Sequence, residues 1–245
     1  LQFVANGALA KFKAGDLSTT FKLGVTGTKL EAKSFRGGVE ADSDQSRGDL
    51  NTQVSFDLPL ASRRKGVRAG IGDLSTNLNL AVRQVSDFGA LTTIGGGVNW
   101  SPVKPVSFIV SMTRQENAPS IAQLGNPLVT TPNAQVFDYV RGASVSVTRV
   151  SGGNPNLKPE IADTWTGGGV YQPHWAPGLS LSVDWYKIDI ADAITAVGAQ
   201  QIIDMCYGFN RPQNPAACDS IVKAPGATNL VNATIYTSGI NAQTV

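Results

Sequence analysis

The sequence has few of the features that mark a soluble enzyme or a helical membrane protein. Charged residues make up 16% of the chain, against about 25% in ordinary soluble domains. No run reaches the roughly 18 to 20 apolar residues of a transmembrane helix. The net charge of +2 is too small to indicate a nucleic-acid partner. The composition leaves open a soluble β-sandwich and a membrane β-barrel, because the alternating strands of a barrel average out in hydropathy.

Motifs for catalysis are also missing from the sequence. The chain contains no Gly-x-Ser-x-Gly elbow, Walker loop or His-Glu-x-x-His motif. The single histidine, His174, lies in a turn-like segment, which favours an interfacial residue over a catalytic base. The Gly-Gly-Gly runs at 95–97 and 167–169 lie inside strand-like segments, which favours close packing or barrel bending over a phosphate cradle. We therefore expect no enzymatic activity and no cofactor.

What the sequence does contain is a repeated alternation of apolar and polar side chains with period two, which predicts strands. These strands are about ten residues long or more, longer than the roughly 5 or 6 of soluble sheets and close to the 9 to 11 that a membrane-crossing strand needs. The polar faces are rich in Ser, Thr, Asn and Gly, which suits a hydrated lumen better than a dry core. The side chains predicted to face lipid are Val54, Phe56, Leu58, Leu78, Leu80, Phe108, Val110, Leu181 and Val183. Those predicted to face the lumen are Ser55, Asn77, Asn79, Ser107, Ser182 and Asp184.

The predicted connections differ in length. Residues 101–105 and 173–178 form short connections, whereas 115–163 and 195–232 exceed the length of ordinary loops. Residues 36–48 are polar and Gly-rich and carry charges of both signs, which predicts a solvated loop. Short turns on one side and long loops on the other are typical of outer-membrane barrels.

The two cysteines, Cys206 and Cys218, flank a polar segment rich in Asn and Pro. An even number of cysteines in such a segment predicts a disulfide and an oxidising compartment. Two unrelated free thiols are the alternative. Neither cysteine has a histidine or carboxylate at a metal-ligand spacing, so no metal site is expected.

Several motifs resemble TonB-dependent outer-membrane receptors. Residues 154–160 read Asn-Pro-Asn-Leu-Lys-Pro-Glu and 163–166 read Asp-Thr-Trp-Thr, which is similar to a late-barrel signature of that family. Residues 118–124 resemble its Ala-Pro-Ser-x-x-x-Leu segment, and residues 179–194, followed by 200–207, match a third. The motif residues singled out are Pro119, Asn154, Pro155, Asn156, Leu157, Pro159 and Glu160.

The resemblance implies an all-β fold, part of a transmembrane antiparallel β-barrel of about 22 strands whose lumen is plugged. We expect residues 1–245 to supply roughly nine or ten strands of it. The plug, the TonB box and the C-terminal strands are expected to lie outside this chain. The family relation further implies the bacterial outer membrane as location, contact with its lipid, and energy from the TonB–ExbB–ExbD system through the plug. It implies a scarce nutrient as substrate, such as a ferric siderophore, cobalamin or an oligosaccharide.

The two long segments are expected to cap the barrel mouth and contact the substrate, because loops on a rigid scaffold carry recognition. The candidate binding residues are Tyr139, Arg141, Tyr207, Asn210 and Arg211. Alternatively, these segments only pack on each other and shield the plug. For the protein as a whole, the alternatives are a passive porin-like or adhesin-like barrel and a soluble, secreted β-rich carbohydrate-binding or hydrolytic domain.

Overall fold

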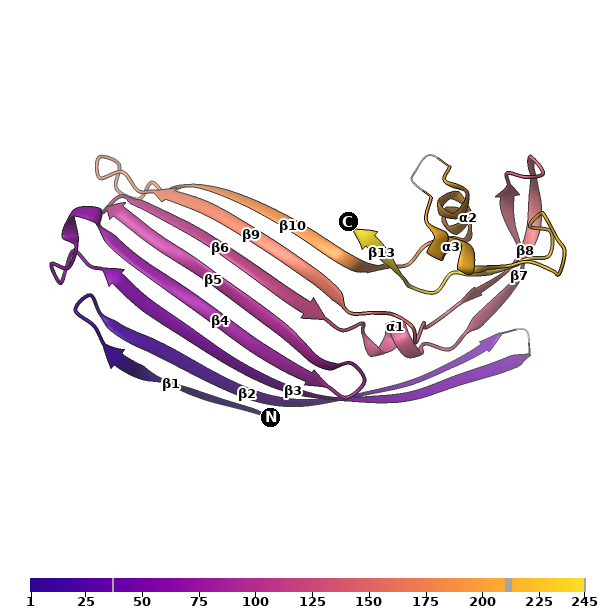
Figure 1. Cartoon of the computed structure of the whole chain (residues 1–245), viewed down its shortest axis with the longest axis horizontal. Coiled ribbons are helices and arrows are strands. Elements are labelled where there is room, and N and C mark those ends of the chain that lie inside the picture. The colour runs from indigo at the N-terminus through magenta and orange to yellow at the C-terminus, as the bar shows by residue number, and fades with distance from the viewer. Residues whose placement is uncertain (37, 210–212, 245) are drawn as a thin grey trace.

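The computed structural model describes residues 1–36, 38–209 and 213–244. These residues form one large curved sheet with a smaller lobe at one end (Figure 1). A search of these residues finds no helical segment with the length and hydropathy of a membrane span.

The large sheet is a single layer of nine strands in the order β1-β2-β3-β4-β5-β6-β9-β10-β13. Each pair of neighbours is antiparallel. The bounds are β1 Gln2–Lys11, β2 Asp16–Arg36, β3 Val39–Ala61, β4 Asp73–Val85, β5 Gly89–Val103, β6 Val106–Asn117, β9 Glu160–Tyr171, β10 Leu181–Thr195 and β13 Ile240–Thr244. Within the described residues, β1 and β13 are the free edges of this sheet.

The lobe contains a second sheet of four strands in the order β11-β12-β8-β7. Its strands are β7 Val129–Asp138, β8 Ala143–Ser151, β11 Ile221–Val222 and β12 Thr234–Tyr236. The helices α2 (Ala199–Tyr207) and α3 (Pro215–Asp219) belong to the lobe, α1 (Ile121–Gly125) lies at its base, and the short 3₁₀ helix η1 (Ala69–Ile71) lies in the β3–β4 connection. The buried hydrophobic cluster of the described chain lies in this lobe and not in the large sheet: Val136, Val145, Val147, Ile202, Ile203, Ala217, Leu230, Ala233 and Ile235.

The register of the large sheet separates apolar from polar side chains, as the alternation predicts. Leu80 lies opposite Val54 and Ile94, whereas Asn79 lies opposite Ser55 and Gly95. Large apolar side chains on the first face stay exposed, Leu80 by 40% and Val110 by 54%. They are open to the surroundings instead of packing against a second sheet, which argues against a sandwich. The antiparallel β-barrel class and the expected number of strands are confirmed.

One prediction about a connection was wrong. Residues 36–48 are not a loop, because β2 and β3 continue as a paired hairpin up to Arg36 opposite Val39. Residues 36–48 contain few apolar side chains, so the apolar alternation that marks a half-buried strand is missing. The segment 115–163, which exceeds the length of an ordinary loop, holds α1 and the strands β7 and β8, which pair with each other. The lobe end also carries a turn at 86–88, so its connections are not all long.

The two triple-glycine runs lie inside paired strands, at points of close approach. A Cβ on Gly97 would lie 3.0 Å from the carbonyl oxygen of Val110. One on Gly168 would collide with the carboxylate of Asp184. These contacts support close packing as the reason for the glycines.

Candidate functional site

The concave face of the large sheet carries a polar groove toward the lobe end, with a volume of about 830 Å³. Amide and hydroxyl side chains on β3, β4, β5 and β6 line much of it, among them Asn51, Gln53 and Asn79. The charged pair within it joins Arg83 to Asp49, with Nε 3.1 Å from the carboxylate oxygen Oδ1. The large sheet is called the wall from here on. Its polar groove suits water and polar solutes, because the side chains there donate and accept hydrogen bonds and present little apolar surface.

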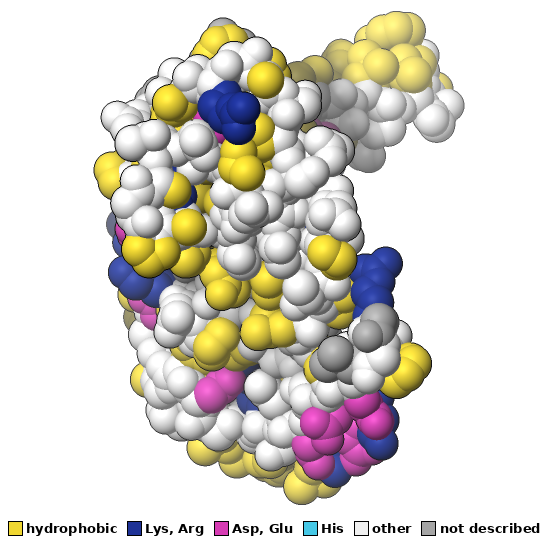
Figure 2. Space-filling model, turned by 90° about the vertical axis from the view of Figure 1, so that its right-hand side faces the viewer, with side chains coloured by type: hydrophobic (Ala, Val, Ile, Leu, Met, Phe, Trp, Pro, Cys, Tyr) yellow, Lys and Arg dark blue, Asp and Glu magenta, His cyan; other side chains and the backbone are white. Residues whose placement is uncertain are grey.

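The β2–β3 hairpin extends beyond the large sheet at the same end. Its register places Glu31 opposite Asp44, and Lys33 opposite Asp42, on one face. Lys29 forms ion pairs with Glu31 and, at 3.3 Å, with Asp44. Figure 2 views the molecule from the lobe end and shows Asp and Glu gathered together with basic side chains.

Arg47 joins this hairpin to the Ala-Pro-Ser segment. Its side chain is only 6% exposed. Nη2 and Nε donate to Oδ2 of Asp87 at 2.7 and 3.1 Å, and Nη1 donates to the carbonyl oxygen of Pro119 at 2.7 Å. The guanidinium also lies 5.5 Å from the centre of the Phe88 ring. One side chain thus holds β3, the β4–β5 turn and the Ala-Pro-Ser segment together.

The Ala-Pro-Ser segment continues into α1. Ser120 caps this helix in a reciprocal capping box with Gln123. A Cβ on Gly125 would collide with Gln45 of β3, so glycine allows the helix to touch the hairpin. The backbone N–H of Asn154 donates to the carbonyl oxygen of Gln123 at 2.8 Å, so the Asn-Pro-Asn motif is bonded to the Ala-Pro-Ser segment.

The Asn-Pro-Asn motif connects strands that are far apart in the sequence. Asn154 donates through Nδ2 to the carbonyl oxygen of Gly239 at 2.8 Å, and its Oδ1 accepts the N–H of Asn156 at 2.9 Å. Leu157 is 4% exposed. Glu160 accepts the backbone N–H of Ile194 on β10 through Oε1.

Asn241 closes the same junction from the other side. Its Oδ1 accepts the N–H of Lys158 at 2.8 Å, and its Nδ2 donates to the carbonyl oxygens of Lys158 and Asp192 at 3.0 and 2.7 Å. Pro155 and Pro159 bracket this bonded stretch and restrict its backbone. The motif residues therefore fasten the base of the lobe to β9, β10 and β13.

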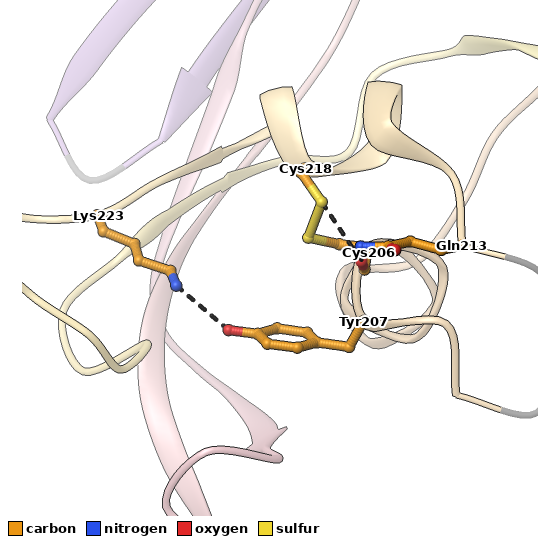
Figure 3. The surroundings of a disulfide bond; sticks show 5 residues. All are labelled: Cys206, Tyr207, Gln213, Cys218 and Lys223. Carbon is orange, nitrogen blue, oxygen red and sulfur yellow. Dashed lines mark hydrogen bonds between the residues drawn. A yellow bond between two sulfur atoms is a disulfide. The ribbon is translucent and has the colours of Figure 1, made fainter.

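The predicted disulfide is present. Cys206 and Cys218 are joined with an S–S distance of 2.11 Å and link α2 to α3 (Figure 3). Gln213 donates through Nε2 to the carbonyl oxygen of Cys206 at 2.9 Å, and Lys223 donates through Nζ to the hydroxyl of Tyr207 at 3.2 Å (Figure 3).

The structure brings two of the five candidate binding residues together. The rings of Tyr139 and Tyr207 lie edge to face, with centroids 6.1 Å apart. Arg141 is exposed in the β7–β8 turn, and Asn210 and Arg211 lie outside the described residues.

Tyr139 also makes contacts inside the lobe. Its hydroxyl donates to Oδ1 of Asp204 at 2.8 Å. Burial, and then this hydrogen bond, raise the pKa of Tyr139.

Sequence reasoning missed two aromatic residues of this group. Phe209 stacks on Tyr139 with ring centroids 4.5 Å apart, and Phe137 meets Tyr139 edge to face at 5.4 Å. Phe137 and Phe209 remain 41% and 48% exposed. The spacing of Phe137 and Tyr139, two residues apart, was the available signal, since it places both side chains on one face of an extended segment. Together these rings form a partly exposed aromatic group on the lobe.

Comparison with known proteins agrees with this architecture. The family model "TonB dependent receptor-like, beta-barrel" matches residues 12–243. Among solved structures, the siderophore receptor PirA from Pseudomonas aeruginosa is similar at a TM-score of 0.56 and 14% identity, covering 99% of this chain and 36% of that one. A mutant of the ferric enterobactin receptor PfeA from Pseudomonas aeruginosa reaches a TM-score of 0.64 at 14% identity, covering 99% of this chain and 31% of that one.

The chain thus spans about a third of the length of these two structures. No curated protein matches it. At such low identity the two structures show the fold alone, whereas the family model spans nearly the whole chain. The chain belongs to the β-barrel family of TonB-dependent receptors.

Proposed function

We propose that this chain is part of an outer-membrane receptor that takes up a scarce nutrient by TonB-dependent active transport. The observation that carries the proposal is a one-layer sheet with exposed apolar side chains on one face and a polar groove on the other, together with a lobe at one end that has its own core. The plug that contacts TonB and the remaining strands would belong to the rest of the receptor. No covalent chemistry by the wall is required.

The exposed convex face supports a position in the membrane. Leu80, Val110 and Val183 would be costly to leave in water, whereas lipid solvates them. Trp100 and Trp175, which lie by the short turns far from the lobe, are 41% and 77% exposed. Aromatic side chains in such places suit the boundary between lipid and water.

The lobe supports a role in recognition. It has its own hydrophobic core and a disulfide, and the family motifs fasten it to the wall. A pre-ordered surface loses less entropy on binding than a flexible loop does. We propose that Tyr139, Arg141, Tyr207, Asn210 and Arg211 supply substrate contacts, with Phe137 and Phe209 beside them.

Three substrate classes remain in the proposal: a ferric siderophore, cobalamin and an oligosaccharide. The two structural relatives are named as a siderophore receptor and a ferric enterobactin receptor, so ferric siderophores are the first class to test. The partly exposed rings of the lobe can stack on a planar aromatic group or on the face of a sugar.

Two perturbations of the full-length receptor test the function. Deletion of residues 207–217, with surface expression verified, should abolish binding and uptake of the cognate nutrient. Loss of TonB in cells with the unaltered receptor should abolish uptake and leave binding intact. Uptake that persists without TonB would show a passive pore. Unchanged binding after the deletion would show that this part of the lobe does not carry recognition.

A further inference from the structure

The convex face of the wall has an apolar hollow of about 590 Å³, here called the Gly96 hollow. It lies on β4, β5 and β6 and reaches Trp165 of β9. The apolar side chains that line it are Leu78, Ile94, Val98, Val110, Met112 and Trp165, and Arg114 also borders it.

A glycine without a covering side chain creates this hollow. Gly96 lies in one register row between Leu78 and Met112. Two other glycines share this face, and aromatic rings cover both: a Cβ on Gly169 would lie 3.4 Å from Phe108, and one on Gly167 would lie 3.7 Å from Trp185. At Gly96 the nearest atom would be a backbone oxygen of Asn77, at 3.3 Å, with no side chain within 4 Å. A neighbouring ring can cover a strand glycine in this way, and Gly96 differs from Gly167 and Gly169 in having no such cover.

The side chain of Arg114 borders the end of the hollow nearer the lobe. Arg114 lies in the next register row, opposite Ile94 and Asp163. Its side chain is 55% exposed and donates from Nη1 to Oδ2 of Asp163 at 3.2 Å. A guanidinium has five N–H donors, so this bond leaves donors for a further acceptor. Lys187, 59% exposed, lies opposite Trp165 in the row below and forms an ion pair with Asp189 at 2.6 Å.

We propose that the Gly96 hollow holds one acyl chain of lipid A, the phosphorylated glycolipid of the outer leaflet, with a lipid phosphate at Arg114. The inference rests on the proposed membrane position of the wall. An apolar hollow gains contacts only from an apolar occupant, and arginine binds phosphate through two parallel hydrogen bonds. Trp165 lies in the register row next to that of Arg114, opposite Met112, and its ring has an apolar body and a polar N–H that suit such a boundary. The bound lipid would then be a structural component of the receptor at β4, β5 and β6.

Native mass spectrometry of the full-length receptor, delipidated in detergent and titrated with bisphosphorylated lipid A, tests the site. Gly96→Leu fills the hollow and should raise the Kd for lipid A about tenfold or more. A tenfold change corresponds to about 1.4 kcal/mol of binding free energy. Arg114→Gln should weaken lipid A binding equally but leave the dephosphorylated lipid unaffected. The matched control is Val183→Phe, which adds bulk to an exposed site of the same face outside the hollow and should change nothing.

A second measurement needs no variant. Lipid A with a photoreactive acyl chain should label the peptide 91–115 of the unaltered receptor in preference to the peptide 180–190. The inference is overturned if Gly96→Leu binds lipid A normally, if phosphatidylglycerol competes equally, or if a second copy of the receptor occupies the hollow and gives a dimer mass. Lost lipid binding with intact nutrient uptake would leave the proposed function standing. A receptor that stays soluble without detergent would overturn both.

Discussion

Replacing Arg47 with Met should loosen the base of the lobe from the wall. The change removes two hydrogen bonds to Asp87 and one to the carbonyl oxygen of Pro119, a buried residue. Breaking a buried ion pair costs about 3 to 5 kcal/mol. Because Asp87 is 37% exposed, water can solvate its carboxylate, and we expect a smaller cost of about 2 to 3 kcal/mol.

Hydrogen exchange of the α1 amides measures this loss of local stability. The N–H groups of Leu124 and Asn126 bond within α1, so their exchange should become about 30 to 150 times faster in Arg47→Met. Arg47→Lys keeps the charge without the planar fork and should give an intermediate effect. Exchange in β4 is the internal control and should not change. If α1 exchanges at the normal rate in both variants, Arg47 does not hold this junction.

Three further predictions concern the lobe and the wall. Cys206→Ser with Cys218→Ser should lower the local stability of the lobe by about 3 kcal/mol, because the bond spans 12 residues; proteolysis restricted to the lobe measures this, and unchanged cleavage rates would argue against it. Val110→Arg should destabilise the membrane-inserted receptor by about 2 to 4 kcal/mol if Val110 lies near the midplane, whereas Ser111→Arg on the opposite face should cost far less; equal effects in reversible folding into vesicles would contradict the assignment of faces. The raised pKa of Tyr139 means that the folded lobe keeps the phenol proton where the unfolded chain loses it. Its contribution should therefore be complete below about pH 10 and fall as the pH rises further, and Tyr139→Phe should abolish that fall in local exchange measurements.

The wall was predictable from the sequence because its signal is local. From β3 to β10 each strand of the large sheet places apolar side chains on a face that meets no other part of the described chain, so alternation alone assigned Leu80 and Asn79 to opposite faces. The disulfide was predictable from composition and spacing, because only one pairing of two cysteines exists.

The lobe and the β2–β3 hairpin were not predictable in the same way. The β8–β12 pairing is parallel and joins Thr148 to Thr234, so it depends on long-range contacts. The hairpin tip has few apolar side chains, so the periodic signal of a strand is absent there. Arg47 contacts Pro119 across 72 residues, and nothing near Arg47 in the sequence indicates this partner. The grouping of Phe137 and Phe209 around Tyr139 likewise requires the folded lobe.

Spin-label accessibility along β4 tests the central claim most directly. Single labels at positions 76 to 83 of the receptor in lipid vesicles should alternate: even positions reached by oxygen dissolved in the bilayer, and odd positions shielded from it. The register predicts this because Leu78 and Leu80 share one face of the wall, while Asn77 and Asn79 share the other. Uniform oxygen accessibility at all eight positions, or strong accessibility at the odd ones, would contradict a lipid-facing convex wall around a polar lumen.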